Sequence, residues 1–88
     1  MIDNRHYLIL SYSDQELRNL IEEYIIQQKA EFTFEGVCSF IAYWAMEDGM
    51  KAGNNKIQPN DQERVRRVLE AIIRDGRITA SGETYNKA

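Results

Sequence analysis

The sequence of 88 residues is poor in cysteine, histidine, proline and tryptophan, with one residue of each. The single cysteine, Cys38, excludes an internal disulfide, and the first residues lack the pattern of a signal peptide, so we expect a cytoplasmic protein. The single histidine, His6, has no partner set of acids and cysteines, so we expect no metal and no cofactor. No apolar run approaches the roughly 20 residues of a membrane helix, so we expect no membrane association.

Residues suited to catalysis are also few. Cys38 has no histidine partner on its predicted helix, which favours a core thiol over a nucleophile. The neighbouring acids Glu22 and Glu23, like Glu47 and Asp48, point to different sides of a helix and make poor catalytic pairs. Because no nucleophile, base and oxyanion donors come together, we predict that the protein is not an enzyme.

Charge is distributed unevenly along the chain, whose net charge is −3. Residues 1–50 hold nine acidic against three basic side chains, a net of −6, and residues 51–88 hold eight basic against five acidic, a net of +3. An acidic body with a basic end is compatible with nucleic-acid binding. The length predicts a single domain over residues 1–88.

Three segments carry apolar residues at the i, i+3, i+4 spacing of a helix that is buried along one stripe. The first is predicted over residues 14–29 and opens with a capping box between Ser13 and Glu16. The second is predicted over residues 34–50, with Thr33 as its N-cap.

The third predicted helix is the element around which the chain is organised. Asn60 is expected to cap its first turn, and Glu63 to complete a capping box, while Pro59 either ends the preceding loop or opens this helix. Gly76 supplies the left-handed residue that ends a helix. The core stripe between these ends comprises Val65, Val68, Leu69, Ile72 and Ile73.

Short extended segments are predicted outside the helices. Residues 32–34 alternate in the way of a very short strand, and residues 77–80 and 84–85 are expected to form a hairpin. Residues 6–12 are compatible with an edge strand or with a lead-in to the first helix, and periodicity does not decide over so short a run. Residues 86–88 are expected to fray.

The predicted second helix is apolar on nearly all sides, which is typical of a helix that is buried twice. Its core stripe is expected to comprise Val37, Phe40, Ile41, Trp44 and Ala45. The opposite face carries Ser39, Ala42, Tyr43, Met46 and Met50. Since methionine and tyrosine are enriched at interfaces, we predict a protein interface at Tyr43, Met46 and Met50, toward a second copy or another protein. The alternative is that residues 1–12 fold back and cover this face.

The order helix, strand, helix, helix and hairpin resembles the winged helix (winged helix-turn-helix) family, loosely its HARE type, over about residues 14–85. The matching segments are Phe32-Thr33-Phe34 before the second helix, the stripe of the third helix, and Asp75-Gly76-Arg77-Ile78 after it. The resemblance implies a mainly α domain with three helices and a small β hairpin, whose third helix enters the DNA major groove. It also implies contacts to double-stranded DNA from Arg64, Arg67, Arg74 and Arg77, and a role in transcription regulation.

Two features depart from that family. The connection before the third helix, with residues 51–59 as the longest loop, has about ten residues, whereas a helix-turn-helix uses about three or four. The third helix is neutral, with four arginines and four acids, and Glu63–Arg67 and Glu70–Arg74 are spaced to form ion pairs that would occupy its arginines.

Two functions therefore stay open. One is DNA binding by a small regulator, with a homodimer formed through the second helix. The other is a protein-interaction module or inhibitor of a larger partner, which uses the same fold without DNA contact.

Overall fold

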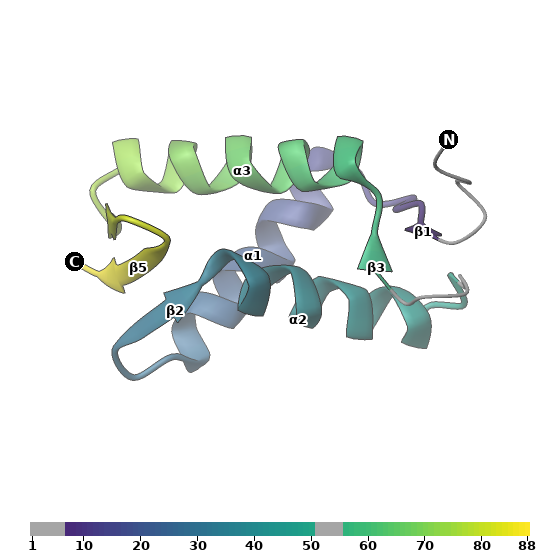
Figure 1. The fold of residues 1–88 in the computed structure, drawn as a ribbon, viewed down its shortest axis with the longest axis horizontal. Coiled ribbons are helices and arrows are strands. Elements are labelled where there is room, and N and C mark those ends of the chain that lie inside the picture. The colour runs from purple at the N-terminus through teal and green to yellow at the C-terminus, as the bar shows by residue number, and fades with distance from the viewer. Residues whose placement is uncertain (1–6, 51–55) are drawn as a thin grey trace.

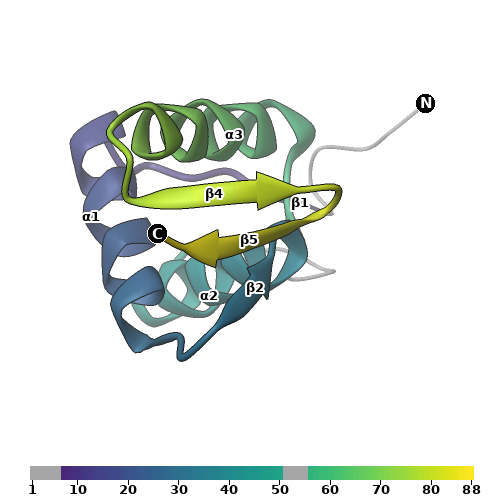
Figure 2. The same ribbon diagram turned by 90° about the vertical axis from the view of Figure 1, so that its left-hand side faces the viewer.

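The computed structural model describes residues 7–50 and 56–88. Its elements, in chain order, are β1 (Tyr7–Leu8), α1 (Asp14–Gln27), β2 (Glu31–Thr33), α2 (Phe34–Glu47), β3 (Lys56–Ile57), α3 (Pro59–Arg74), β4 (Ile78–Ser81) and β5 (Thr84–Lys87). The helices α2 and α3 lie on opposite sides of the molecule in both ribbon views, and α1 lies against both (Figures 1 and 2). The three helices and the antiparallel sheet confirm the predicted small helical domain with a hairpin.

The first helix begins as predicted. The Ser13 hydroxyl accepts a hydrogen bond from the Glu16 amide at 3.1 Å, and the Glu16 carboxylate accepts one from the Ser13 amide at 3.0 Å. The helix ends at Gln27, two residues before the predicted boundary, because Gln28 is extended at φ −83° and ψ 141°. The chain turns there into β2.

The second helix also begins as predicted, since the Thr33 hydroxyl accepts a hydrogen bond from the Gly36 amide at 3.0 Å. It ends at Glu47, whereas the sequence predicted position 50. The reason is Gly49, whose φ of 92° is left-handed. Its amide bonds to the Met46 carbonyl at 3.0 Å, and the next amide bonds to the Ala45 carbonyl at 2.9 Å, which is a Schellman ending.

The third helix starts before the predicted cap. Asn60 is not the N-cap; that position is held by Gln58, which makes no side-chain capping bond. Pro59 takes the first helical position, where its missing N–H costs no hydrogen bond and its fixed φ suits the helix. The predicted ending is confirmed, because Gly76 has a φ of 78° and donates to the Ile73 carbonyl at 2.9 Å.

The hairpin forms a three-stranded antiparallel sheet with β2, in the order β2-β5-β4. The central strand β5 pairs Phe32 with Tyr85 on one side and Thr79 with Asn86 on the other. The Ala88 amide extends the ladder by donating to the Arg77 carbonyl at 3.0 Å. The predicted fraying of residues 86–88 is therefore wrong, because hydrogen bonds hold this end of the chain to its neighbours.

A second, two-stranded sheet joins β1 to β3 in parallel, pairing Tyr7 with Lys56 and Leu8 with Ile57. The segment before α1 is thus extended, and the predicted long loop contains a strand. The Gln58 amide adds a hydrogen bond to the Leu8 carbonyl at 3.0 Å. The predictions for His6 and for residues 51–55 fall outside the described residues.

The core lies between the three helices and also receives apolar side chains from the strands β1, β2, β3 and β4. Its buried apolar members are Leu8, Leu10, Leu17, Ile21, Ile25, Phe32, Val37, Ile41, Ala42, Ala45, Ile57, Val65, Leu69, Ile72 and Ile78. The prediction for α2 is wrong at two positions: Trp44, placed in the core stripe, is 42% exposed, and Ala42, placed on the outer face, is buried. The buried stripe of α2 is rotated toward Ala42 because β3 packs against the helix there, where Ala42 shares a pocket with Lys56 and Ile57.

Candidate functional site

The predicted DNA contact Arg64 belongs to a polar cluster that ties α3 to the segment before α1. Asp61, whose residue is only 4% exposed, accepts hydrogen bonds from the Leu10 amide at 2.9 Å and from the Gln58 side chain at 3.1 Å. Its other oxygen accepts from Arg64 Nη1 at 3.0 Å. The buried carboxylate is thus satisfied on both oxygens.

The remaining Arg64 donors are also engaged. Nη2 donates to the Tyr12 carbonyl at 2.6 Å, and Nε donates to an Asp14 carboxylate oxygen at 3.1 Å. Burial by itself acts to lower the pKa of Arg64, but the hydrogen bonds and charges of Asp61 and Asp14 raise it above its usual value. The structure therefore places Arg64 as an anchor for the chain entering α1. The sequence offered one signal for this cluster, an acid in the first turn of α3.

The predicted contact Arg77 lies in a second polar cluster, at the other end of α3. Its guanidinium forms an ion pair with Glu22 of α1. Arg18, one turn earlier on α1, bonds to the Asp75 carboxylate at 2.7 Å and lies 3.6 Å from the Glu22 carboxylate. The hydrogen bond with Asp75 is the main cause that raises the pKa of Arg18. These four charges alternate in sign and join α1 to the end of α3.

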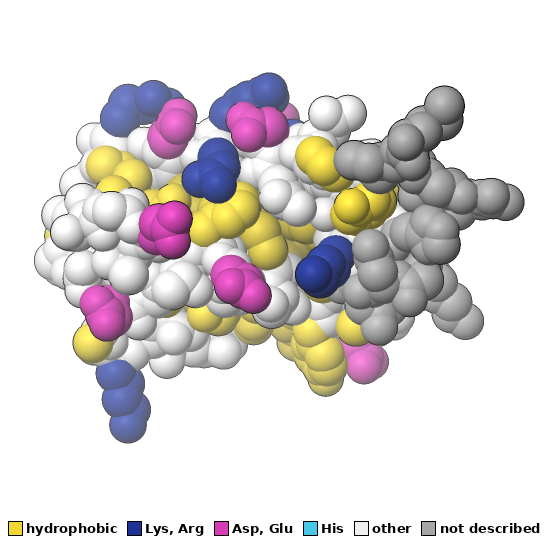
Figure 3. All heavy atoms as spheres, in the orientation of Figure 1, with side chains coloured by type: hydrophobic (Ala, Val, Ile, Leu, Met, Phe, Trp, Pro, Cys, Tyr) yellow, Lys and Arg dark blue, Asp and Glu magenta, His cyan; other side chains and the backbone are white. Residues whose placement is uncertain are grey.

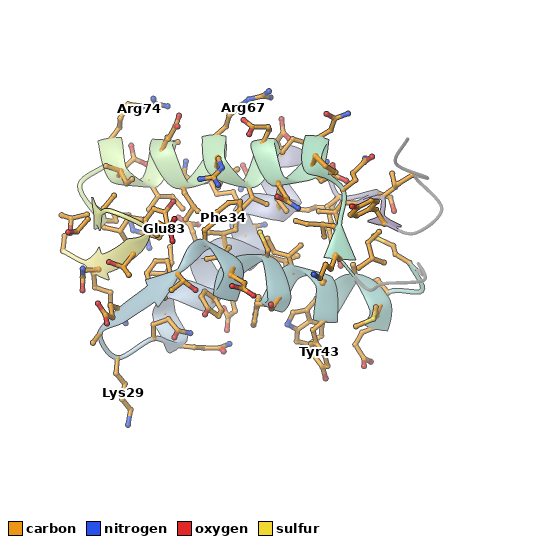
Figure 4. The ribbon with its side chains drawn as sticks, viewed as in Figure 1. Lys29, Phe34, Tyr43, Arg67, Arg74 and Glu83 are labelled. Carbon is orange, nitrogen blue, oxygen red and sulfur yellow. The ribbon has the colours of Figure 1, made fainter. Side chains whose placement is uncertain are left out.

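The predicted contacts Arg67 and Arg74 are arranged differently. Both are exposed and project from the side of α3 that faces away from α2 (Figure 4). Within residues 7–50 and 56–88, neither forms an ion pair, and the expected pairs with Glu63 and Glu70 are not formed. Of the four predicted DNA contacts, these two have their guanidinium groups available.

A contact that the sequence did not reveal joins α3 to the start of α2. The guanidinium of Arg66 lies 4.0 Å from the centre of the Phe34 ring, in a cation–π arrangement. The two side chains line a pocket beside the hairpin turn at Gly82 and Glu83. Hydrophobic side chains continue between α3 and α2 on the face shown in Figure 3. Arg66 was missed because no spacing rule relates it to Phe34.

The predicted protein interface on α2 is partly exposed. Tyr43 is 52% exposed and Met46 is 37% exposed, whereas Met50 is half-buried and packs against the core. Trp44 adds a neighbouring ring, with its centre 5.5 Å from that of Tyr43. We call Tyr43, Trp44 and Met46 the α2 face, and Figure 4 shows Tyr43 pointing away from α3.

Residues 7–12 leave the α2 face open. Tyr12 reaches the end of α2, where its hydroxyl donates a hydrogen bond to Asp48. Burial, followed by this contact, raises the pKa of Tyr12. Because Tyr43 and Met46 are exposed, the described part of the N-terminal segment does not cover them.

Cys38 lies in a pocket of about 320 Å³ between α2, β3 and the first turn of α3. Burial raises the pKa of its thiol to about 11, so the thiol is protonated near neutral pH. Within the described ranges, no group of three or more His, Cys, Asp or Glu side chains is placed to hold a metal ion.

Comparisons with known proteins identify no relative of this chain. A scan against protein-family models finds no match, and searches of curated proteins and of solved structures find none either. No helix in the described part of the chain has the length and apolar character to cross a membrane.

Proposed function

We propose that this chain is a winged helix-like module that binds another protein through the α2 face. The observation that carries the proposal is the exposure of three large apolar side chains, Tyr43, Trp44 and Met46, within about one turn of one helix. Buried aromatic and methionine side chains are the usual anchors of protein interfaces. The element order of helix, strand, helix, helix and hairpin supports the winged helix-like assignment.

Charge around the α2 face indicates the chemistry of the partner. The helix has no lysine or arginine, and its acids are Glu35 in the first turn and Glu47 at the end, followed by Asp48. Two copies meeting through this face would bring acidic groups together. A segment that presents apolar side chains and a basic rim is complementary to it, so we assign the partner as a basic amphipathic helix.

The first test uses the single tryptophan as the reporter. Trp44 lies within the α2 face, so its fluorescence should change when a synthetic amphipathic helix with leucines on one side and lysines on the other is added. A peptide with glutamates in place of the lysines should bind at least about tenfold more weakly. The Met46→Lys variant should also lose about tenfold in affinity, because it places a positive charge at the contact.

Ile26→Lys provides the matched control, since Ile26 is an exposed apolar side chain on α1, outside the α2 face. This variant should bind the lysine peptide as the unchanged protein does. A peptide with the same composition in scrambled order tests for unspecific attraction. Equal binding of the lysine and glutamate peptides, or full binding by Met46→Lys, would show that the α2 face is not the contact.

Binding of double-stranded DNA through α3 is the second candidate function. It is favoured by Arg67 and Arg74, whose guanidinium groups are exposed and form no ion pair within the described ranges. Arg64 and Arg77, which the resemblance also implied, are held by Asp61 and Glu22 and make weaker candidates.

The DNA candidate predicts a salt-dependent affinity. If both free arginines neutralise phosphates, the double variant Arg67→Ala/Arg74→Ala should flatten the slope of log affinity against log salt by about 2. Fluorescence anisotropy with a labelled duplex of mixed sequence, at low and moderate salt, measures this slope. An unchanged slope would remove α3 as the DNA contact, and an absence of binding at low salt would remove the DNA function.

A further inference from the structure

Three arginines from two helices surround one surface pocket of about 250 Å³ between α1 and α3. Its lining residues are Asp14, Gln15, Arg18, Arg64, Arg67, Val68 and Ala71. Arg18 belongs to α1 and the other two arginines to α3, so the fold brings together positive charges that are far apart in the sequence. Since the α2 face lies on another helix, this pocket is a separate feature of the molecule.

Two of the arginines are held in place from outside the pocket. Asp75 fixes Arg18 through a hydrogen bond of 2.7 Å, and Asp61 fixes Arg64 through one of 3.0 Å. Neither of these acids lines the pocket. Guanidinium groups that are held by acids behind them lose little freedom when they bind a ligand in front. Arg67 supplies a third guanidinium, which has no ion-pair partner within the described ranges.

The single acid of the pocket lining marks where a negative group is accommodated. One carboxylate oxygen of Asp14 lies 3.1 Å from Arg64 Nε and 3.0 Å from its Nη2. The Asp14 side chain is 84% exposed, so its carboxylate can turn into solvent when another anion takes its place. The pocket also adjoins the first turn of α1, where the helix dipole favours negative charge.

We propose that this pocket binds a phosphate group, which displaces the Asp14 carboxylate from Arg64 and is held by Arg67 and Arg18 as well. Arginine suits this ligand because its planar group donates two parallel hydrogen bonds to phosphate oxygens. The proposal does not depend on the α2 face and stands if the peptide experiment fails. The proposal differs from DNA binding along α3 because it requires Arg67 but not Arg74, which does not line the pocket.

The experiment is a titration with inorganic phosphate, followed by two-dimensional NMR of the backbone amides and arginine side chains. Ionic strength is kept constant with sodium chloride. Shifts should concentrate at residues 14–18 and 64–71, and Arg67→Gln should weaken the apparent affinity by about tenfold, as expected for a lost hydrogen bond to a charged group. Arg74→Gln, which removes another exposed arginine of α3 that forms no ion pair with a described residue, should leave the affinity unchanged.

Asp14→Asn tests the competition within the pocket. If the Asp14 carboxylate occupies the phosphate position, its neutralisation should strengthen phosphate binding several-fold. Glu70→Gln is the matched control, because it removes an exposed acid of α3 outside the pocket lining and should have no such effect. Equal losses in Arg67→Gln and Arg74→Gln would indicate general electrostatic attraction and overturn the proposal, as would the absence of localised shifts.

A second arm identifies the source of the phosphate group. A short DNA duplex is titrated under the same conditions, and inorganic phosphate is then added as a competitor. If the duplex binds, if Arg67→Gln weakens its binding, and if phosphate displaces it, then the pocket is assigned to a nucleic-acid backbone. Localised binding of inorganic phosphate without duplex binding assigns it to a free phosphate or a small phosphorylated molecule.

Discussion

Replacing Asp61 with Ala is expected to lower the free energy of unfolding by about 3 kcal/mol, which is a large part of the stability of a domain this small. The carboxylate accepts hydrogen bonds from the Leu10 amide, Gln58 and Arg64. Its removal leaves the Leu10 amide without its acceptor in a buried position. It also leaves a half-buried guanidinium without one of its two carboxylate partners, which costs more than the net gain from the intact pair.

Chemical denaturation followed by circular dichroism measures this change. Glu63→Ala is the matched control, since Glu63 is an exposed acid two residues away on the same helix, and it should change stability by less than about 0.5 kcal/mol. The free energy of unfolding of Asp61→Asn should lie between those of the two alanine variants. The asparagine amide keeps one acceptor oxygen, but its NH2 group faces another hydrogen-bond donor. If Asp61→Ala and Glu63→Ala are equally stable, the cluster does not hold α3 to the N-terminal segment.

The parts of this fold that the sequence predicted correctly depend on residues a few positions apart. The capping bonds of Ser13 and Thr33 join residues three positions apart, and Gly76 ends α3 through its own backbone conformation. Such signals are complete within one turn of chain. The same reasoning failed at Asn60, because the neighbouring Pro59 opens the helix and the N-cap is therefore Gln58.

The parts that could not be predicted depend on contacts between distant residues. Leu10 and Asp61 are 51 positions apart, and no pattern in either segment indicates their hydrogen bond. For α2, helical spacing identified an apolar stripe, but the side on which β3 packs decides whether Ala42 or Trp44 is covered. Candidate DNA contacts were assigned by position from the winged helix resemblance, and only the tertiary structure separates Arg64, which is held by Asp61, from Arg67, which forms no ion pair with a described residue.

Replacing Gly36 with Ala is expected to lower the free energy of unfolding by about 1–3 kcal/mol, the usual cost of an oversized side chain at a close contact. In an ordinary helix this change stabilises by up to about 1 kcal/mol. Here the new Cβ would lie 2.5 Å from the Tyr24 hydroxyl oxygen and 3.3 Å from the capping hydroxyl of Thr33. The Tyr24 ring has little room to move, because it packs against Phe32 and Phe40 with ring centres 5.8 and 5.1 Å away.

The double variant Tyr24→Phe/Gly36→Ala separates this contact from other effects of the alanine. Removal of the hydroxyl opens the space that the Cβ requires, so the double variant should recover most of the lost stability. Tyr24→Phe alone is the control and should change stability by less than about 1 kcal/mol.

The contact at Gly36 is also connected to the α2 face, because Tyr24 packs on Phe40, and Phe40 packs on Trp44. Because these rings connect the close contact at Gly36 to Trp44, we expect Gly36→Ala to shift Trp44 fluorescence in the folded protein. If Tyr24→Phe fails to restore both stability and fluorescence, the contact between Tyr24 and Gly36 does not position this face.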